Sequence, residues 1–317
     1  MTIARSVEEV TPCIRNGTCL TIGNFDGVHR GHQALVARLL ELARRRDLES
    51  VVVTFDPHPL RILMGQTPPF ITPTEQKLEL LDKLGLDFIL CLSFDREMAA
   101  LSPEEFVERY LVHGLLAKHI VIGHDYAFGK NRRGNFQLLS ELGKRFGYEV
   151  EQIAAVSDGE APVSSTRIRT LIQAGDVWQA RPLLGRFYRV AGTVIEGRRR
   201  GGPLLGIPTA NLNPTDELIP KPGVYAVWAG LEDGLRPAVA NVGYNPTFSN
   251  GRDMSVEVHI LDFDRDIYGS LLHVHFVQRL RDETKFSGVQ ELLAQIRRDI
   301  EEARSLLGRS GAGPGTS

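Results

Sequence analysis

Apolar runs of strand length alternate with helix-patterned segments between residues 18 and about 156. Apolar residues of segment 32–43 recur at the helical period and share one face, which predicts an amphipathic helix. Such alternation favours a parallel sheet with helices on both of its faces. The strands that we expect are 19–23, 51–55, 88–94 and 119–123.

Two further helices carry start signals. The strings Thr72-Pro-Thr-Glu75 and Ser102-Pro-Glu-Glu105 each offer a hydroxyl cap, a proline at the first helical position and a glutamate at the third. In a parallel sheet, ligands bind beyond the carboxyl ends of the strands. The segments that directly follow the expected strands are therefore where we look for function.

The pattern changes after about residue 185. Short β-rich runs follow one another, separated by Gly, Pro, Asn and Asp, which favours an antiparallel barrel or sandwich. We expect a β-barrel, closed by a helix over 289–307 whose apolar stripe packs on it. The runs cover 188–195, 224–229, 238–242, 255–261 and 271–277.

This change predicts two domains, 1–184 and 185–308. A chain of 317 residues is long enough to bury two cores. The tail 309–317 is poor in apolar residues, and we expect it to be disordered.

Charge and cysteine usage narrow the class of protein. The 39 acidic and 37 basic residues nearly balance, so no overall field favours nucleic acid or a membrane surface. The N-terminus shows no signal-peptide pattern, and no later run is long and uncharged enough to span a bilayer. Cys13, Cys19 and Cys91 form no CxxC pair, consistent with reduced thiols. These features predict a cytoplasmic enzyme.

The densest motif is Gly23-Asn-Phe-Asp-Gly-Val-His-Arg-Gly-His32, at a predicted strand–helix junction. Glycines let the backbone approach a ligand, and the N–H groups of a helix start attract anions. His29 and His32 can add charge or hydrogen bonds to a phosphate without acting as nucleophiles. The motif therefore predicts a nucleotide site. Alternatively, the histidines could ligate a metal, although no further Cys or His accompanies them, or the glycines could serve only a tight turn.

Three more segments follow predicted strands or open a helix. Thr54–Pro59 contains Asp56 and two prolines, and Gly123–Gly129 combines glycines with two aromatic rings. Ser164–Arg169 places hydroxyls and two arginines in a first helical turn, which suits an anion. Each has a plainer interpretation as a proline-stiffened turn, a loop with buried rings or an N-cap.

In order, these four segments resemble the FMN adenylyltransferase (FAD synthetase) module of bacteria, a member of the HxGH nucleotidyltransferases. Tyr126 departs from that pattern, which usually has Phe. The resemblance implies that His29, His32 and Arg167 stabilise the triphosphate. It implies nucleotide binding by Gly23, Phe25, Asp26, Gly31, Ser165 and Thr166. It implies flavin contacts from Asp56, His58, Pro59, Asp125 and Phe128.

The second half has its own dense region at 192–211. A Gly-rich loop with Arg198, Arg199 and Arg200 could wrap a polyphosphate, although it is no Walker A loop. Thr209 and Asn211 stand two apart, so on an extended segment their oxygens point the same way and suit a hard cation shared with phosphates. The alternative is a flexible, charged hairpin.

Glu257 alternates with Val256 and Val258 on a predicted strand, opposite their apolar face. Phosphoryl transfer to a neutral alcohol benefits from a base, and a carboxylate placed in this way could provide it. The alternative is a solvent-facing strand carboxylate, which is what most such residues are.

Gly206-Ile-Pro-Thr-Ala-Asn211, the string Asn241–Phe248 and the string Leu280–Phe286 resemble, in order, the riboflavin kinases. That resemblance implies that Thr209 and Asn211 bind Mg²⁺ and nucleotide and that Glu257 activates the ribityl 5′-hydroxyl. It also implies nucleotide contact at Gly201 and flavin contact at Arg281. The loop between Gly201 and Gly206 is about one residue longer than is usual, so the arginine that meets phosphate stays open.

Together the two resemblances imply the bacterial bifunctional riboflavin kinase/FAD synthetase family. Its substrates are riboflavin, FMN and ATP, with Mg²⁺ as cofactor, FMN and FAD as products, and no nucleic acid or membrane partner. The oligomeric state stays open. Two alternatives remain: an HxGH enzyme that adenylylates another phosphate, or a flavin-binding regulatory protein that has lost catalysis.

Overall fold

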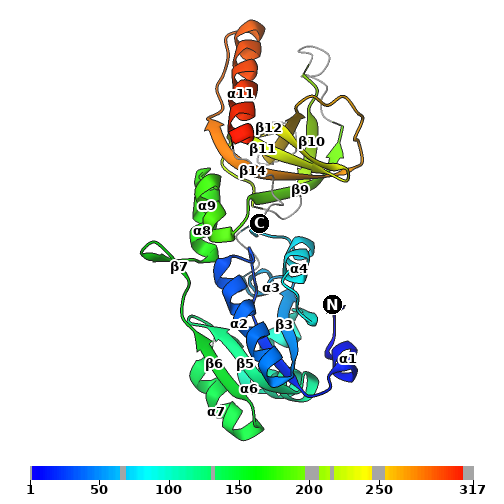
Figure 1. Cartoon of the computed structure of the whole chain (residues 1–317), viewed down its shortest axis with the longest axis vertical. Helices are drawn as coiled ribbons and strands as arrows, with labels where there is room; N and C mark the ends of the chain where they lie inside the picture. Colours follow the sequence, from blue (N-terminus) through cyan, green and yellow to red (C-terminus); the bar gives the residue numbers. More distant parts are fainter. Residues whose placement is uncertain are drawn as a thin grey trace. The chain divides into compact units, whose positions relative to one another are not determined.

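The computed structural model describes residues 2–64, 69–129, 133–196, 207–214, 218–244 and 254–309. The chain forms two compact units, Met1–Ser164 and Ser165–Ser317 (Figure 1). Of the tail that we expected to be disordered, residues 310–317 lie outside the described ranges. Among the described helices, none combines the length and the apolar composition that crossing a bilayer requires.

The first unit is built on a six-stranded parallel sheet in the order β1-β4-β3-β2-β5-β6. The expected parallel sheet is thus confirmed, with two edge strands, β1 and β6, that the apolar pattern did not indicate. β6 has no fully buried residue, and its sequence contains no apolar run from which a strand could be predicted. The strands are β1 (Thr2–Ala4), β2 (Thr18–Ile22), β3 (Glu49–Asp56), β4 (Phe88–Ser93), β5 (Ala117–Gly123) and β6 (Glu149–Ile153).

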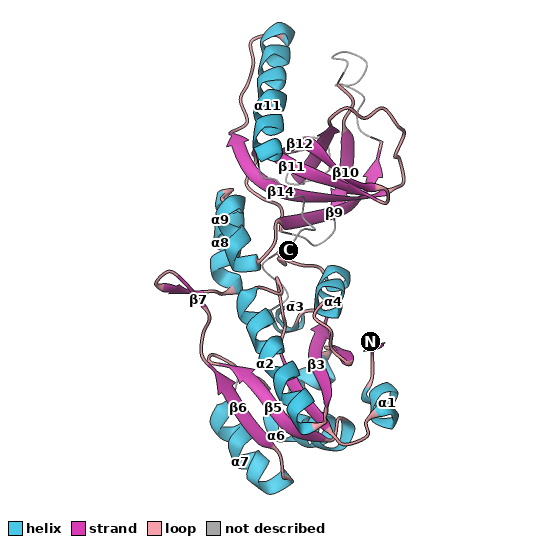
Figure 2. Ribbon diagram, in the orientation of Figure 1, coloured by secondary structure: helices cyan, strands magenta, loops and turns pink. Residues whose placement is uncertain are grey.

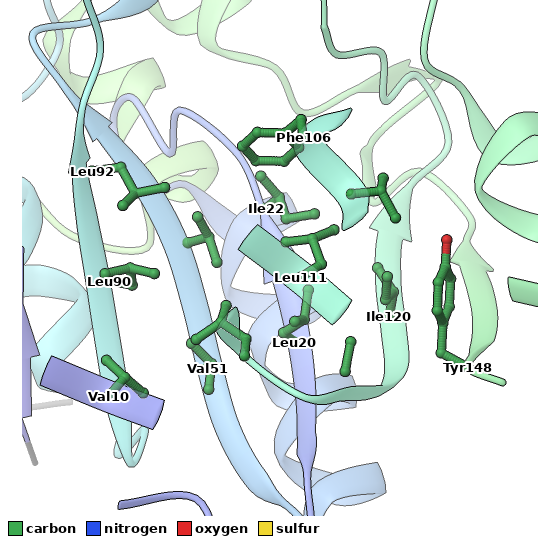
Figure 3. Close-up of a cluster of buried hydrophobic side chains, with 14 of the residues drawn as sticks. Val10, Leu20, Ile22, Val51, Leu90, Leu92, Phe106, Leu111, Ile120 and Tyr148 are labelled. Atoms are coloured by element: carbon green, nitrogen blue, oxygen red, sulfur yellow. The ribbon is translucent and has the colours of Figure 1, made fainter. Parts of the chain in front are cut away.

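Helices cover both faces of this sheet because successive strand residues point to opposite sides. Cys19 and Val52 face α2 and α4, whereas Leu20 and Val51 face the helices of the other side (Figure 3). The helices are α1 (Val7–Val10), α2 (Arg30–Arg46), α3 (Pro59–Met64), α4 (Thr74–Asp82), α5 (Arg96–Ala100), α6 (Pro103–Phe106), the π-helix η2 (Val107–Gly114) and α7 (Phe136–Phe146), with a short 3₁₀ turn η1 (Thr11–Cys13). A two-stranded hairpin, β7 (Ser157–Asp158) and β8 (Ala161–Pro162), follows β6.

One of the two predicted helix starts is confirmed and the other is wrong. Ser102 caps α6 in a complete capping box with Glu105. α4 begins at Thr74 instead of after Thr72. The reason is that Thr72 is engaged elsewhere: its N–H donates to Asp26 and its hydroxyl accepts from the N–H of Gly27.

The second unit begins with α8 (Ser165–Ala174) and α9 (Val177–Leu184) and continues as a closed antiparallel barrel (Figure 2). The strand order β10-β13-β12-β11-β14-β9 closes through the pairing of β9 with β10. The predicted barrel is therefore confirmed; β10 and α9 were not predicted. The strands are β9 (Tyr188–Ile195), β10 (Ala210–Pro214), β11 (Gly223–Leu231), β12 (Gly234–Tyr244), β13 (Met254–Ile260) and β14 (Leu271–Arg281).

The predicted closing helix is α11 (Val289–Arg309), which packs against β11, β12 and β14 on the outside of the barrel. Its Ala303 and Leu307 are buried with Val224, Ala226 and Val277 of the strands. The apolar stripe read from the sequence thus contacts the surface that we expected.

Residues 165–184, which we expected in the first domain, cluster with the barrel. α9 packs on β14 and β9, with Leu183 and Leu184 fully buried. The Arg181 guanidinium lies 4.4 Å from the centre of the Phe187 ring, and the N–H of Lys221 donates to the Ile172 carbonyl of α8. The boundary of the functional domains near 185 stays a prediction.

Candidate active sites

The loop that follows β2 has an unusual backbone. Phe25 (φ 52°), Gly27 (φ 88°) and Val28 (φ 38°) all adopt left-handed conformations. A β-branched residue such as Val28 rarely does so, and strain of this kind clusters at ligand sites. The loop begins at Gly23, whose N–H donates to the Val53 carbonyl at 3.0 Å. β2 lies between β3 and β5, where the strand order reverses, which is where parallel sheets bind ligands.

The two histidines of the motif are fixed against each other at the start of α2. His29 is the N-cap residue, and its Nδ1 accepts from the His32 N–H at 3.3 Å. The rings stack with centroids 3.6 Å apart, and Phe25 meets His32 edge-on. A Cβ at Gly31 would lie 3.1 Å from His29 Cε1, so glycine there leaves room for the buried imidazole. Among the described residues, no cluster of His, Cys, Asp and Glu could hold a metal ion.

The turn after β3 is held by local contacts. Asp56 Oδ1 accepts from the Thr74 hydroxyl at 2.6 Å, and the Asp56–Pro57 peptide bond is cis. His58 Nδ1 accepts from the Leu60 N–H, and Pro59 begins α3. The turn therefore lies beyond the carboxyl end of β3, as expected, with a defined shape. The flavin contacts assigned to Asp56, His58 and Pro59 remain predictions.

The loop after β5 combines an exposed acid with packed rings. The Asp125 side chain is 82% exposed. Phe128 stacks on Tyr126 and pairs through its backbone with Gly134, and both rings pack on the core. Where the family pattern usually has Phe, Tyr126 adds a hydroxyl group. This hydroxyl is buried without a hydrogen-bond partner among the described residues. The two rings thus match the plainer interpretation of this loop, while flavin contact by Asp125 and Phe128 stays a prediction.

Ser165, Thr166 and Arg167 form the first turn of α8, so the helix predicted there is confirmed. α8 belongs to the second compact unit. Within the first unit, the carbonyl of Val163 lies 3.6 Å from where a Cβ of Gly31 would be. The nucleotide roles of the three α8 residues rest on the sequence resemblance and remain predictions.

In the barrel, Glu257 lies directly between two asparagines on neighbouring strands. Its Cα pairs with Asn211 of β10 on one side and with Asn241 of β12 on the other. Directly paired residues of antiparallel strands point to the same face, so the three side chains share one face. Val256 and Val258 are buried on the opposite face, as the alternation predicted. Asn241 was not among the residues that we singled out, although it opens the string Asn241–Phe248.

The surroundings of Glu257 make it a stronger base than a solvated glutamate. Burial raises the pKa of its carboxyl, and the nearby Glu283 carboxylate raises that pKa further. A half-buried carboxylate beside two amides differs from a carboxylate that merely faces solvent.

Thr209 lines a pocket of about 400 Å³ formed by residues of β9, β10, β13 and the loop that follows β13. The wall also includes Val194, Val258 and the loop residues Phe263 and Tyr268. Its apolar and aromatic lining with a few polar groups is typical of small-molecule sites. Gly201 and the three arginines at 198–200 lie outside the described residues, as do residues 245–248.

Arg281, predicted to contact flavin, holds a structural position. Its Nη2 donates to Asp299 Oδ2 at 2.8 Å and its Nε to Oδ1 at 3.0 Å, and Asp299 on α11 is 3% exposed. The guanidinium also lies over the Phe286 ring. Arg281 thus joins the end of β14 to α11, and its flavin contact remains a prediction.

Comparison with known proteins decides the family. The FAD synthetase family profile matches residues 12–167, and the riboflavin kinase profile matches residues 184–307. The chain is 37% identical to the bifunctional riboflavin kinase/FMN adenylyltransferase of Escherichia coli strain K12, over 97% of its own length and 98% of that protein's. The chain belongs to this family. A Pseudomonas fluorescens member is 39% identical over 96% of this chain and 98% of its own.

A solved structure supports the fold along the same length. The crystal structure named as a macrolide-efflux protein from Streptococcus pneumoniae matches with a TM-score of 0.84 at 33% identity. It covers 96% of this chain and 98% of its own. The parallel sheet and the barrel expected from the sequence thus have a counterpart along nearly the whole length of a solved structure.

Proposed function

We propose that the barrel unit transfers the γ-phosphoryl group of ATP to riboflavin, giving FMN. The unit with the parallel sheet then adenylylates FMN with a second ATP, giving FAD and pyrophosphate. The observation that carries this proposal is that one chain matches both enzyme families end to end. The geometry of the first unit supports it, because the motif at 23–32 follows β2, where the strand order of the parallel sheet reverses.

In the kinase reaction the nucleophile is a neutral alcohol. Glu257 accepts the proton of the ribityl 5′-hydroxyl as that oxygen bonds to the γ-phosphorus, and ADP leaves. Asn211 lies beside Glu257, and Thr209 stands two residues before Asn211. Their amide and hydroxyl oxygens fit a hard cation. These two residues would hold Mg²⁺, which when bound neutralises phosphate charge.

In the adenylyl transfer the nucleophile is already charged. A phosphate oxygen of FMN attacks the α-phosphorus in line, and the bond to pyrophosphate breaks. No protein nucleophile or base is needed, so catalysis depends on positioning and on stabilising charge. The stacked His29 and His32 supply that stabilisation within the first unit, and the sequence resemblance assigns a further contribution to Arg167. The loop that begins at Gly23 brings backbone N–H groups to the triphosphate.

The experiment is incubation of the purified chain with riboflavin and Mg-ATP, followed by chromatographic separation of flavins. FMN should form first and FAD after it. Formation of neither product would favour a flavin-binding protein without catalysis. FMN without FAD, combined with adenylylation of another phosphate, would favour a different HxGH specificity. We place these reactions in the cytoplasm, where ATP and reduced thiols are both found.

A further inference from the structure

Residues 71–77, which we call the tether, connect loops that follow two neighbouring strands. The N–H groups of Ile71 and Thr72 donate to Asp26 Oδ1 at 2.9 and 3.1 Å. In return, the N–H of Gly27 donates to Thr72 Oγ1 at 3.0 Å. The first half of the tether therefore holds the loop after β2, which carries the nucleotide motif.

The second half of the tether holds the end of β3. The Thr74 hydroxyl donates to Asp56 Oδ1 at 2.6 Å. Three residues later, Lys77 Nζ donates to the Phe55 carbonyl at 2.9 Å. Phe55 and Asp56 lead directly into the turn to which FMN contacts are assigned. One short segment thus contacts the expected nucleotide loop and the expected FMN turn through different residues.

Lys77 is an unusual residue for its place. It is 4% exposed in α4, and burying an ammonium group is unfavourable where an apolar side chain would pack without that penalty. Burial lowers the pKa of the Lys77 ammonium, and the nearby Arg5 lowers it further. Three groups raise this pKa and partly offset the effect: Cys91, Asp56 and Asp26. The buried cation does more than fill space, because it supplies a donor to the carbonyl beside the FMN turn.

We propose that the tether positions the two substrates of adenylyl transfer separately, with Thr72 setting the nucleotide loop and Lys77 setting the FMN turn. Both are positioning residues, since they act through the loops that they hold. This inference rests on the proposed adenylyltransferase function of the first unit. In-line transfer between two bound substrates is sensitive to such positioning, because a misplacement of about 1 Å can cost about 10²-fold in rate.

The test measures KM for FMN, KM for ATP and kcat of FAD formation in the full chain. Lys77→Met should raise KM for FMN roughly tenfold or more and leave KM for ATP within about twofold. Thr72→Val should raise KM for ATP roughly tenfold or more and leave KM for FMN within about twofold. Lys83→Met is the matched control, because the side chain of Lys83 at the end of α4 is 64% exposed and its ammonium group bonds only Glu79 of the same helix among the described residues. Its FAD kinetics should equal those of the wild type.

Riboflavin phosphorylation by the same preparations shows that the barrel unit is folded, and urea unfolding with pulse proteolysis shows separately that the first unit is folded. If Lys77→Met yields no folded first unit, Thr74→Val replaces it, because Thr74 is half-buried and its loss removes the contact with Asp56. It too should raise KM for FMN alone. Equal changes in both KM values, or a loss of stability with unchanged kinetics, would overturn the proposal. Failure of the wild-type chain to make FAD would instead overturn the proposed function.

Discussion

Glu257 is flanked by an asparagine on each neighbouring strand, Asn211 and Asn241. Amides beside it can orient a hydroxyl without supplying a charge that would hold its pKa low. Its pKa is instead raised by burial and then by Glu283. At the residue scale, this environment favours proton acceptance from an alcohol over a purely structural role.

Glu257→Gln keeps the size of the side chain but cannot accept a proton near neutral pH. We expect kcat for FMN formation to fall by about 10²–10⁴, with little change in apparent riboflavin affinity. Conversion of supplied FMN to FAD should continue at the wild-type rate. Steady-state kinetics of both reactions on one preparation provide the measurement.

The matched control is Glu232→Gln, the same charge change in the exposed turn between β11 and β12. An exposed substitution of this kind should shift stability by no more than about 0.5 kcal/mol and leave turnover unchanged. If Glu257→Gln behaved like this control, Glu257 would be removed from the mechanism.

At the scale of elements, β5 and β6 bury a histidine in a charged environment. The His119 side chain is 4% exposed, and its Nδ1 lies 3.5 Å from Glu149 Oε2. Burial lowers the pKa of His119, Arg46 lowers it further, and Glu149 and Glu151 oppose these effects. Both carboxylates are already paired with arginines, Glu149 with Arg46 and Glu151 with Arg38.

Acid should therefore destabilise the first unit through His119. Its ordinary pKa is 6.5 and its folded pKa is lower, so the unfolded chain binds this proton first as the pH falls. Stability is fully present above about pH 6.5 and declines below it by up to about 1.4 kcal/mol per pH unit, until the folded pKa is reached. In His119→Gln this decline should be smaller.

Urea unfolding with pulse proteolysis follows each unit by its own fragments. It measures how much the free energy of unfolding of the first unit differs between pH 7 and pH 5. His113→Gln is the control, because His113 at the end of η2 has a 69% exposed side chain. Identical pH dependence in the wild type and in His119→Gln would show that other groups account for the acid sensitivity.

At the scale of the whole molecule, the packing of α8 and α9 on the barrel determines where the chain can be cut to obtain a stable barrel fragment. Fragments 165–317 and 185–317 should both make FMN and no FAD, because the two motif sets do not interleave. The longer fragment should be more stable by at least about 3 kcal/mol, since Leu183 and Leu184 are fully buried.

Unfolding curves and FMN formation by the two fragments test this expectation. Equal stability would mean that α9 does not contribute to the barrel unit. A folded 165–317 fragment without kinase activity would show that the two activities are not independent.

Much of this molecule is encoded locally. Strand β3 has six consecutive buried residues because helices cover both faces of the sheet, and such a run stands out in any sequence. The motif at 23–32 is contiguous, so its place between a strand and a helix follows from the chain itself. The 3.6-residue period of α11 and the alternation around Glu257 likewise predicted which faces are buried.

The remaining features depend on residues far apart in the sequence, which local patterns do not encode. Asn241 meets Glu257 only through the register of two barrel strands, and Lys77 meets Phe55 only when α4 packs on the sheet. α4 begins later than its sequence predicts because Thr72 bonds to a loop 45 residues earlier in the chain. The grouping of α9 with the barrel was likewise decided by packing, because an amphipathic helix can bury its apolar face against either neighbour, and only the folded structure selects one.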